Sequence, residues 1–275
     1  MQITDITGSV KLNNGVEMPY IGLGVFQSRD GQEVINAITY ALDAGYRHID
    51  TASFYENENG VGNAIKNYNI NRNEVFFTSK VWNDDQGYDS TIKAFNKSLN
   101  LMGFDYLDLY LVHWPVKGKF KETYRALETL YKEGKVRAIG VSNFNETHID
   151  ELMQNAEITP AVNQIEFHPR LVQQSLLDKC FELGIRPEAW SPLMKGLVFD
   201  INELQKIANR YDKNIPQLVL RWNLQKGVIT IPKSINKKRI ESNANIFDFI
   251  INDEDMHKID RLNQNIRTGP DPDSF

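Results

Sequence analysis

Eight short apolar segments recur along the chain, and stretches with a helical spacing of apolar residues separate them. The apolar segments begin at Ile21, Tyr46, Val75, Tyr106, Arg137, Ala161, Ile185 and Gly227. In the first helical stretch Val34, Ile38, Ala41 and Leu42 share one face, and Gly45 follows at the position where glycine ends many helices. Strands that are joined by a helix must lie parallel, because the chain has to cross back before the next strand begins.

Eight strand–helix units in 275 residues predict an α/β fold, a (β/α)8 barrel, with an open doubly wound sheet as the alternative. The Asn14-Gly15 pair between two short alternating segments predicts an N-terminal β-hairpin. The proline- and aspartate-rich segment from Arg267 predicts a short irregular tail, and no linker-like stretch divides residues 1–275, so one domain is expected. Further helices are expected over 57–68, 88–102, 121–134, 146–155, 172–183, 201–211, 215–225 and 236–263.

The charge balance narrows the classes of function. The formal net charge is −5, so the chain lacks the basic surplus with which nucleic-acid and membrane-surface binders neutralise phosphates. No apolar run reaches membrane-spanning length, and the first ten residues lack the basic and apolar regions of a secretory signal. The single cysteine, Cys180, lies on the apolar side of a predicted helix, where a buried and inert thiol is expected. These features predict a cytoplasmic protein without nucleic-acid or membrane partners.

Polar and aromatic residues gather where the predicted strands end. In a barrel the site lies at the carboxyl ends of the strands, whereas buried parallel strands otherwise consist of aliphatic residues. The residues at these ends are Asp50, Lys80, Trp82, His113, Trp114, Ser142, Asn143, Gln164, His168, Trp190, Ser191, Lys233 and Ser234. Their convergence on one rim predicts the location of the functional site.

Four ionisable side chains suit the reduction of a carbonyl group. Lys80 lies within an apolar run and needs a partner, and Asp50 on the neighbouring strand can supply it, although a purely structural ion pair is an alternative. The Lys80 ammonium is expected to lower the pKa of Tyr55 and so make this phenol a proton donor near neutral pH. Neutral His113 can hold a carbonyl oxygen. None of these groups supplies a hydride, so a cofactor is required.

The segment from Ile231 to Asn243 is the best candidate for binding that cofactor. It runs from the eighth predicted strand into a helix N-terminus, which favours anions, at the usual phosphate site of a barrel. Lys233, Ser234 and Arg239 are predicted to bind phosphate, while other lysines there form a solvated helix face. The "GVGNAI" stretch from residue 60 follows no strand and is not interpreted as a nucleotide motif.

Aromatic residues complete the predicted site. Trp190 offers a flat face for stacking, Trp82 and Trp114 are expected to wall the substrate pocket, and Trp222 is expected to pack inside a helix layer.

Six ordered motifs, "GYRHIDTASFYENE", "LDLYLVHWP", "AIGVSNF", "NQIEFHP", "EAWSPL" and "TIPKS", resemble the aldo-keto reductase superfamily. Among its members the chain is similar to prokaryotic reductases of glyoxals, small aldehydes and diketogluconate. The resemblance implies a monomeric barrel that uses NADPH without a Rossmann domain, with a catalytic tetrad of Tyr55, Asp50, Lys80 and His113. The short tail implies an open and permissive substrate site.

The resemblance also implies contacts for each part of the cofactor. Ser142, Asn143 and Gln164 would hold the nicotinamide carboxamide, and Trp190 would stack on the ring. Lys233, Ser234 and Arg239 would bind the 2′-phosphate, and Asn243 would reach the adenine. The full implied sets are Ser142, Asn143, Gln164, Trp190, Ser191, Leu193, Ile231, Lys233, Ser234, Arg239 and Asn243 for the cofactor, and Phe26, Trp82, His113 and Trp114 for the substrate.

Two other functions fit the same sequence less well. A cofactor-binding regulatory or structural protein would share the fold without needing an intact set of Asp50, Tyr55, Lys80 and His113. A metal-dependent barrel hydrolase would need clustered ligands, whereas the five histidines are scattered along the chain without an H-x-H pair at a strand end, so no metal site is expected.

Overall fold

Eight parallel strands form a closed barrel in the computed structural model, which describes residues 2–275. The strands are β3 (Leu23–Gly24), β4 (His48–Asp50), β5 (Phe76–Val81), β6 (Leu107–Val112), β7 (Val136–Ser142), β8 (Val162–Glu166), β9 (Arg186–Trp190) and β10 (Ile229–Thr230). Their order in the sheet follows their order in the chain. Parallel bridges from Ile21 to Thr230 and from Gly24 to Lys233 join the two edges. The predicted barrel is confirmed, and the open doubly wound sheet is wrong.

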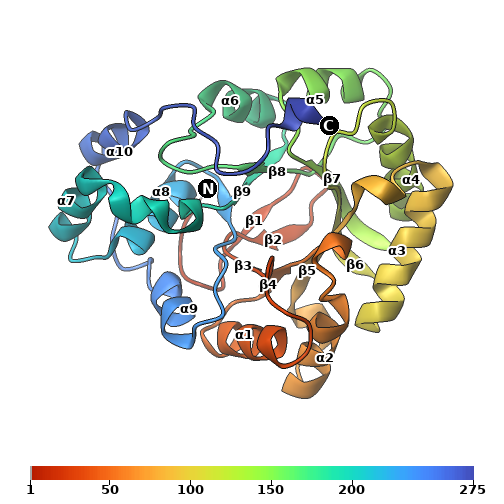
Figure 1. Cartoon of the computed structure of the whole chain (residues 1–275), viewed down its shortest axis with the longest axis horizontal. Coiled ribbons are helices and arrows are strands. Elements are labelled where there is room, and N and C mark those ends of the chain that lie inside the picture. Colours follow the sequence, from red (N-terminus) through yellow and green to blue (C-terminus); the bar gives the residue numbers. More distant parts are fainter. Residues whose placement is uncertain (1) are drawn as a thin grey trace.

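The helices surround the strands as an outer ring (Figure 1). They are α1 (Gln32–Asp43), α2 (Glu58–Tyr68), α3 (Tyr88–Met102), α4 (Phe120–Lys132), α5 (Glu146–Met153), α6 (Gln174–Glu182), α7 (Asn202–Arg210), α8 (Ile215–Gln225), α9 (Lys237–Ala244) and α10 (Asp253–Asp260). The glycines of the "GVGNAI" stretch lie inside α2. A Cβ at Gly62 would come within 2.0 Å of the Met102 carbonyl oxygen, so this glycine allows α2 to approach α3 closely. None of the helices within residues 2–275 is long and apolar enough to cross a membrane.

The predicted helix over 236–263 is wrong, because two helices and an irregular segment occupy this range. The side chains of α8 bind the backbone of that segment: Gln217 donates to the Asn245 carbonyl at 3.0 Å and Arg221 to the Ile246 carbonyl at 3.2 Å. Gln225 both donates to the Ile251 carbonyl and accepts from its N–H, at 2.8 Å in each case. These long-range bonds replace helical ones, and the apolar periodicity gave no sign of them.

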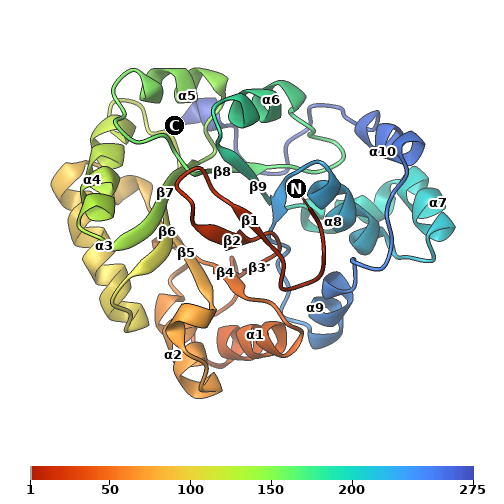
Figure 2. The same cartoon turned by 180° about the vertical axis from the view of Figure 1, so that it is seen from behind.

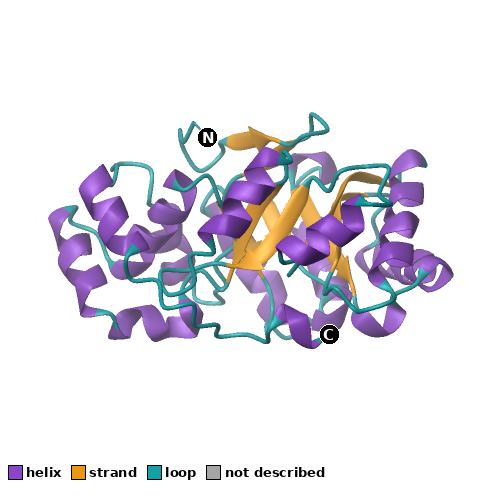
Figure 3. Cartoon of the chain, turned by 90° about the horizontal axis from the view of Figure 1, so that it is seen from above, coloured by secondary structure: helices purple, strands orange, loops and turns teal. Residues whose placement is uncertain are grey.

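The N-terminal hairpin closes one end of the barrel. Strands β1 (Ser9–Lys11) and β2 (Glu17–Pro19) pair antiparallel around the Asn14-Gly15 turn, as predicted. Figure 2 shows the hairpin lying across the barrel, and Figure 3 shows it at the end opposite to the C-terminus. Met18, in the middle of β2, is fully buried. The hairpin therefore blocks the amino ends of the strands and leaves the carboxyl ends for the site.

Candidate active site

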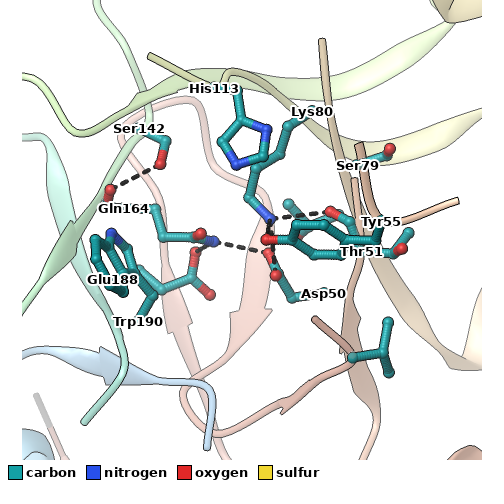
Figure 4. Close-up of polar contacts among 12 residues, drawn as sticks. Asp50, Thr51, Tyr55, Ser79, Lys80, His113, Ser142, Gln164, Glu188 and Trp190 are labelled. Carbon is teal, nitrogen blue, oxygen red and sulfur yellow. Dashed lines mark hydrogen bonds and ion pairs between the residues drawn. The ribbon is translucent and has the colours of Figure 1, made fainter. Parts of the chain in front are cut away.

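The ammonium group of Lys80 is the centre of a buried polar cluster inside the barrel (Figure 4). It donates to Asp50 Oδ1 at 2.8 Å, to the Thr51 carbonyl oxygen at 2.9 Å and to the Tyr55 hydroxyl at 3.3 Å. Lys80 and Asp50 lie on neighbouring strands, β5 and β4, and both side chains are buried. The expected pairing of these two residues is confirmed, and Tyr55 completes it from the 3-10 turn Ser53–Tyr55 that follows β4.

Gln164 joins Asp50 to a second buried carboxyl group, that of Glu188. Its side-chain Nε2 donates to Asp50 Oδ2 at 2.7 Å and to Glu188 Oε2 at 2.8 Å. Gln164 and Glu188 are in register on the adjacent strands β8 and β9. Burial and the nearby Asp50 charge raise the pKa of Glu188 to about 8. Sequence reasoning missed Glu188, although a carboxylate inside the apolar run "IRPEAW" carries the same signal that identified Lys80.

Tyr55 differs from the expectation in the direction of its pKa shift. Burial raises the pKa of Tyr55 and outweighs the lowering effect of the Lys80 charge. The expectation that Lys80 would bring this pKa down toward neutrality is wrong for the structure as it stands. The reason is burial of part of the ring, which packs against Phe26 at 4.9 Å and against His113 at 5.8 Å between centroids. The phenol is consequently protonated at neutral pH.

His113 is held as a neutral imidazole. Burial, helped by the Lys80 charge, lowers its pKa well below the usual value. Asn143 donates to the His113 carbonyl oxygen at 3.0 Å and so positions the backbone that carries the ring. The ring lies edge-on to Trp82, with 5.1 Å between centroids. A neutral ring in this position can donate one hydrogen bond without adding a second positive charge beside Lys80.

Aromatic rings wall the space beside His113. Phe54 stacks on Trp82 with 3.8 Å between centroids, and Trp114 lies parallel to His113 at 6.4 Å. Phe54 was missed from the sequence, although it directly precedes Tyr55. Phe26 and Phe54 keep 41% and 46% of their surface exposed, which leaves two apolar faces open to an incoming molecule.

The residues expected at the nicotinamide end form one hydrogen-bonded group. Ser142 donates to the Gln164 carbonyl at 3.0 Å, and Trp190 Nε1 donates to Asn143 Oδ1 at 2.8 Å. Asn143 and Ser191 both have positive φ, 65° and 50°, at the points where β7 and β9 end and the chain turns away. These bonds bring residues from three strands to one side of the Lys80 cluster.

The residues expected at the phosphate end lie beyond β10 and in α9. Lys233 and Arg239 are exposed, Ser234 and Asn243 are buried, and Asn236 caps α9 by accepting from the Arg239 N–H at 3.1 Å. Burial, and then the charge of Arg239, lower the pKa of Lys233 against the opposite effect of Glu33. Within residues 2–275 neither cation is within ion-pair distance of a carboxylate. Two neighbouring unpaired cations at a helix N-terminus suit a phosphate group.

Comparisons with known proteins agree with this geometry. The profile of the aldo/keto reductase family matches residues 20–264. The chain belongs to this family. It is 57% identical over 272 residues to the glyoxal reductase of Bacillus subtilis, with 99% of each chain covered.

Two solved structures of related proteins share the fold. The aldo-keto reductase MGS-M4 from a deep-sea metagenome library of the Medee basin superposes with a TM-score of 0.93 at 49% identity, covering 96% of this chain and 98% of that one. A point mutant of Gox0644, crystallised in complex with NADPH, gives a TM-score of 0.93 at 40% identity, covering 100% and 99% of the two chains.

The tail of this aldo/keto reductase lies across the rim of the barrel. Glu166, at the end of β8, accepts from the N–H and the hydroxyl of Thr268 at 2.6 and 2.5 Å, and from His168 at 3.1 Å. A Cβ at Gly269 would come within 2.4 Å of the Trp190 ring, so the tail backbone packs directly against that ring. Phe275 stacks on Trp114 at 4.3 Å. The tail is irregular apart from the 3-10 turn Pro272–Ser274, as predicted, but it covers part of a site that was expected to be open.

Two further expectations concern residues away from the reaction. Cys180 is buried, and burial raises its pKa to about 11, so its thiol is confirmed as buried and protonated. Trp222 is fully buried in α8, stacks on Phe167 at 4.8 Å and donates to Asp260 at 2.9 Å, which confirms its packing role. Within residues 2–275 no group of three or more histidine, cysteine, aspartate or glutamate side chains is arranged to hold a metal ion.

Proposed function

We propose that the protein reduces aldehyde or ketone carbonyl groups to alcohols with NADPH as cofactor and Tyr55 as proton donor. The observation that carries the proposal is the chain of contacts from the Tyr55 hydroxyl to Lys80 at 3.3 Å and on to Asp50 at 2.8 Å, beside the neutral ring of His113. Membership of the aldo/keto reductase family supports the same reaction class.

Reduction of a C=O group needs a hydride at carbon and a proton at oxygen. Bound NADPH supplies the hydride. The Tyr55 hydroxyl donates the proton, and it is protonated at neutral pH because burial raises its pKa. The Lys80 ammonium stabilises the phenolate that remains, since the two groups are already in contact. The His113 ring donates a hydrogen bond that orients the carbonyl oxygen and stabilises the charge developing on it.

The chain's own residues fit NADPH at both ends of the cofactor. Gln164 has both amide hydrogens directed at carboxyl groups, so its carbonyl oxygen remains to accept from a carboxamide NH2. Ser142, Asn143, Trp190, Ser191 and Leu193 would border the ring, and Ile231 and Asn243 would border the adenosine. The unpaired cations Lys233 and Arg239, with Ser234, would bind the 2′-phosphate. The structure of the Gox0644 mutant with NADPH, at 40% identity, supports this choice of cofactor.

The substrates that we propose are glyoxals and small aldehydes, with keto sugars as further candidates. The 57% identity to a glyoxal reductase supports the first class. The pocket residues Phe26, Trp82, His113 and Trp114, joined by Phe54, present apolar faces and neutral donors, which suit small uncharged dicarbonyl compounds.

The deciding experiment measures NADPH oxidation by the wild type and by Tyr55→Phe with methylglyoxal, phenylglyoxal, simple aldehydes, aldoses and a diketo sugar acid. We expect kcat to fall by about 10³-fold or more in the variant, because the proton donor is lost, while the Kd for NADPH changes little. Wild-type rates in Tyr55→Phe would refute the assignment. If the wild type binds NADPH but turns over no member of the panel, a regulatory or structural binding protein becomes the better description.

The phosphate contact has its own test. In Arg239→Ala we expect the Kd for NADPH to rise by about 10-fold or more and the Kd for NADH to change by less than about 2-fold, because only NADPH carries the 2′-phosphate. Fluorescence titration measures both constants, and Lys238→Ala on the outer face of α9 is the matched control. Equal losses for the two cofactors would contradict a 2′-phosphate contact.

The proposal also includes a monomeric enzyme in the cytoplasm without nucleic-acid partners. The net charge of −5 and the single buried cysteine support these statements. Light scattering on a size-exclusion column tests the monomer, and a dimer mass would contradict it.

A further inference from the structure

Glu188 is a buried carboxyl group that the proposed reaction does not yet use. It lies in the middle of β9 and has no solvent exposure. Its hydrogen bond from Gln164 connects it to the Lys80 cluster (Figure 4). Its second oxygen, Oε1, has no hydrogen-bond partner within residues 2–275, and the nearest ring nitrogen, Nε2 of His48, is 3.7 Å away. Burying a carboxyl group with one unpaired oxygen costs folding free energy, and this cost suggests that Glu188 has a functional role.

The groups around Glu188 contain one permanent cation for two carboxyl groups. The neighbouring strands present residues that do not titrate, Gln164 on β8 and Ile229 on β10. Across the barrel interior, β4 brings His48 and Asp50, β5 brings Lys80, and the turn after β4 brings Tyr55. Asp50 forms the ion pair with Lys80, with 2.8 Å between Oδ1 and Nζ.

Burial raises the pKa of both carboxyl groups, but the Lys80 ammonium contacts Asp50, so Glu188 is the carboxyl group that keeps its proton. His48 offers no charge to compensate an anion, because burial lowers its pKa to about 3. The pKa of Glu188, raised to about 8 by burial and by the Asp50 charge, agrees with this distribution of charge.

We infer that Glu188 is a positioning residue of the reaction: in its neutral form it holds the Gln164 amide against Asp50, and on ionising it adds a negative charge that keeps Tyr55 protonated in alkaline solution. Glu188 can position the Gln164 amide because the single NH2 group of Gln164 donates to both Asp50 and Glu188. Ionised Glu188 favours the protonated form of Tyr55 because its negative charge raises the pKa values of both Tyr55 and Lys80. Reduction needs protonated Tyr55, so the ionisation of Glu188 extends this reaction to higher pH.

This inference rests on the proposed function, in which Tyr55 is the proton donor, and Glu188→Gln tests it. The variant keeps the size of the side chain and an oxygen that accepts from Gln164, but it cannot ionise. We expect the alkaline limb of kcat/KM for carbonyl reduction to move to lower pH by about 0.5–1 unit. The rising limb for alcohol oxidation with NADP⁺ should move the same way, since both limbs report the ionisation of Tyr55. A general loss of packing would lower both rates without moving either limb.

Glu58→Gln is the matched control. Glu58 is also a buried carboxyl group, but it lies in α2 and accepts from the Ser79 hydroxyl at 2.6 Å rather than from the Gln164 amide. This variant should leave both limbs in place. Unchanged limbs in Glu188→Gln would overturn the inference, and so would equal shifts in the two variants. Tyr55→Phe separates this failure from that of the proposed function: a dead Tyr55→Phe with unshifted limbs in Glu188→Gln refutes only the role of Glu188.

A second measurement does not depend on turnover or on the folding of Glu188→Gln. Infrared spectroscopy of Glu58→Gln in D2O should show the C=O stretch of a protonated carboxyl group that persists at pH 7 and disappears as the pH rises through about 8. If no protonated carboxyl group remains at pH 7, Glu188 is ionised there and the inference is wrong. Where the double variant Glu58→Gln/Glu188→Gln folds, its spectrum should lack the band. Glu58→Gln is the background in both cases because burial also raises the pKa of Glu58.

Discussion

Two buried aspartates lie inside neighbouring parts of the sheet, and their surroundings differ in the number of cations and in access to water. Asp108, on β6, accepts from Arg72 at 2.8 Å, from Arg137 at 2.7 Å and from the Phe77 N–H at 2.9 Å. The arginine side chains are 18% and 45% exposed. Asp50 shares one fully buried lysine with Tyr55 and is bridged to Glu188.

The difference separates an ion cluster without a proposed catalytic role from the cluster that we propose to be reactive. Asp108 contacts two arginines, and both arginine side chains remain in contact with water. Around Asp50 a single buried ammonium serves two buried carboxyl groups and a half-buried phenol, so the ionisations of these groups are linked. The Asp108 cluster is near the hairpin end of the barrel and the Asp50 cluster is near the opposite end, where barrel enzymes carry their sites.

The largest expected difference between the clusters comes from removing one cation of each. Lys80→Met leaves Asp50 buried without a partner, so we expect a loss of about 3–5 kcal/mol in the free energy of unfolding and a fall in kcat of about 10³-fold or more. Arg137→Met leaves Asp108 paired with Arg72 and should cost about 1 kcal/mol or less, with kcat unchanged within about 2-fold. Urea unfolding and NADPH oxidation measure the two effects. Similar losses of activity in both variants would remove the distinction.

A smaller effect concerns the pH dependence of stability. The pKa of Glu188 is raised from 4.5 to about 8 on folding, so the folded state keeps a proton that the unfolded state has lost, and stability falls as the pH rises through this window. His48, with its pKa lowered from 6.5 to about 3, has the opposite effect below pH 6.5. Between pH 6.5 and 8 the Glu188 effect is therefore separate from that of His48.

In that upper window the wild type should lose about 1.5 kcal/mol of unfolding free energy that Glu188→Gln does not lose. Urea unfolding at three pH values measures the two slopes. Parallel slopes would show that Glu188 is already ionised in the folded protein.

The smallest effect is the response to salt. We expect about 0.5 M NaCl to reduce the cost of Arg137→Met toward zero, because the Arg137 side chain is 45% exposed and ions can screen it. The cost of Lys80→Met should change by less than about 0.5 kcal/mol, since neither partner is reached by solvent. Urea unfolding at low and high salt gives both values, and a large salt effect on Lys80→Met would mean that water enters the Asp50 cluster.

Local patterns predicted most of the fold and the core of the site. The apolar runs and the helical spacing located all eight barrel strands, and Asn14-Gly15 located the hairpin, because side-chain periodicity and turn chemistry are local properties. Lys80 was found because a lysine within an apolar strand needs a partner of opposite charge. Asp50 was inferred as this partner because it lies at the end of the neighbouring parallel strand. The same rule applies to Glu188 and Asp108, but the sequence does not show how many cations surround each one.

The sequence by itself determined the order of the strands and helices, and it predicted the end of the barrel at which the proposed site lies and the types of the groups proposed to react. Only the tertiary structure decided which protons these groups hold, because burial and distance set the pKa values of Tyr55 and Glu188. It also decided that the helix expected over 236–263 is divided and that the tail lies on Trp114 and Trp190. These features depend on contacts between residues far apart in the chain, such as Gln164 with Asp50, and periodicity within one segment carries no information about them.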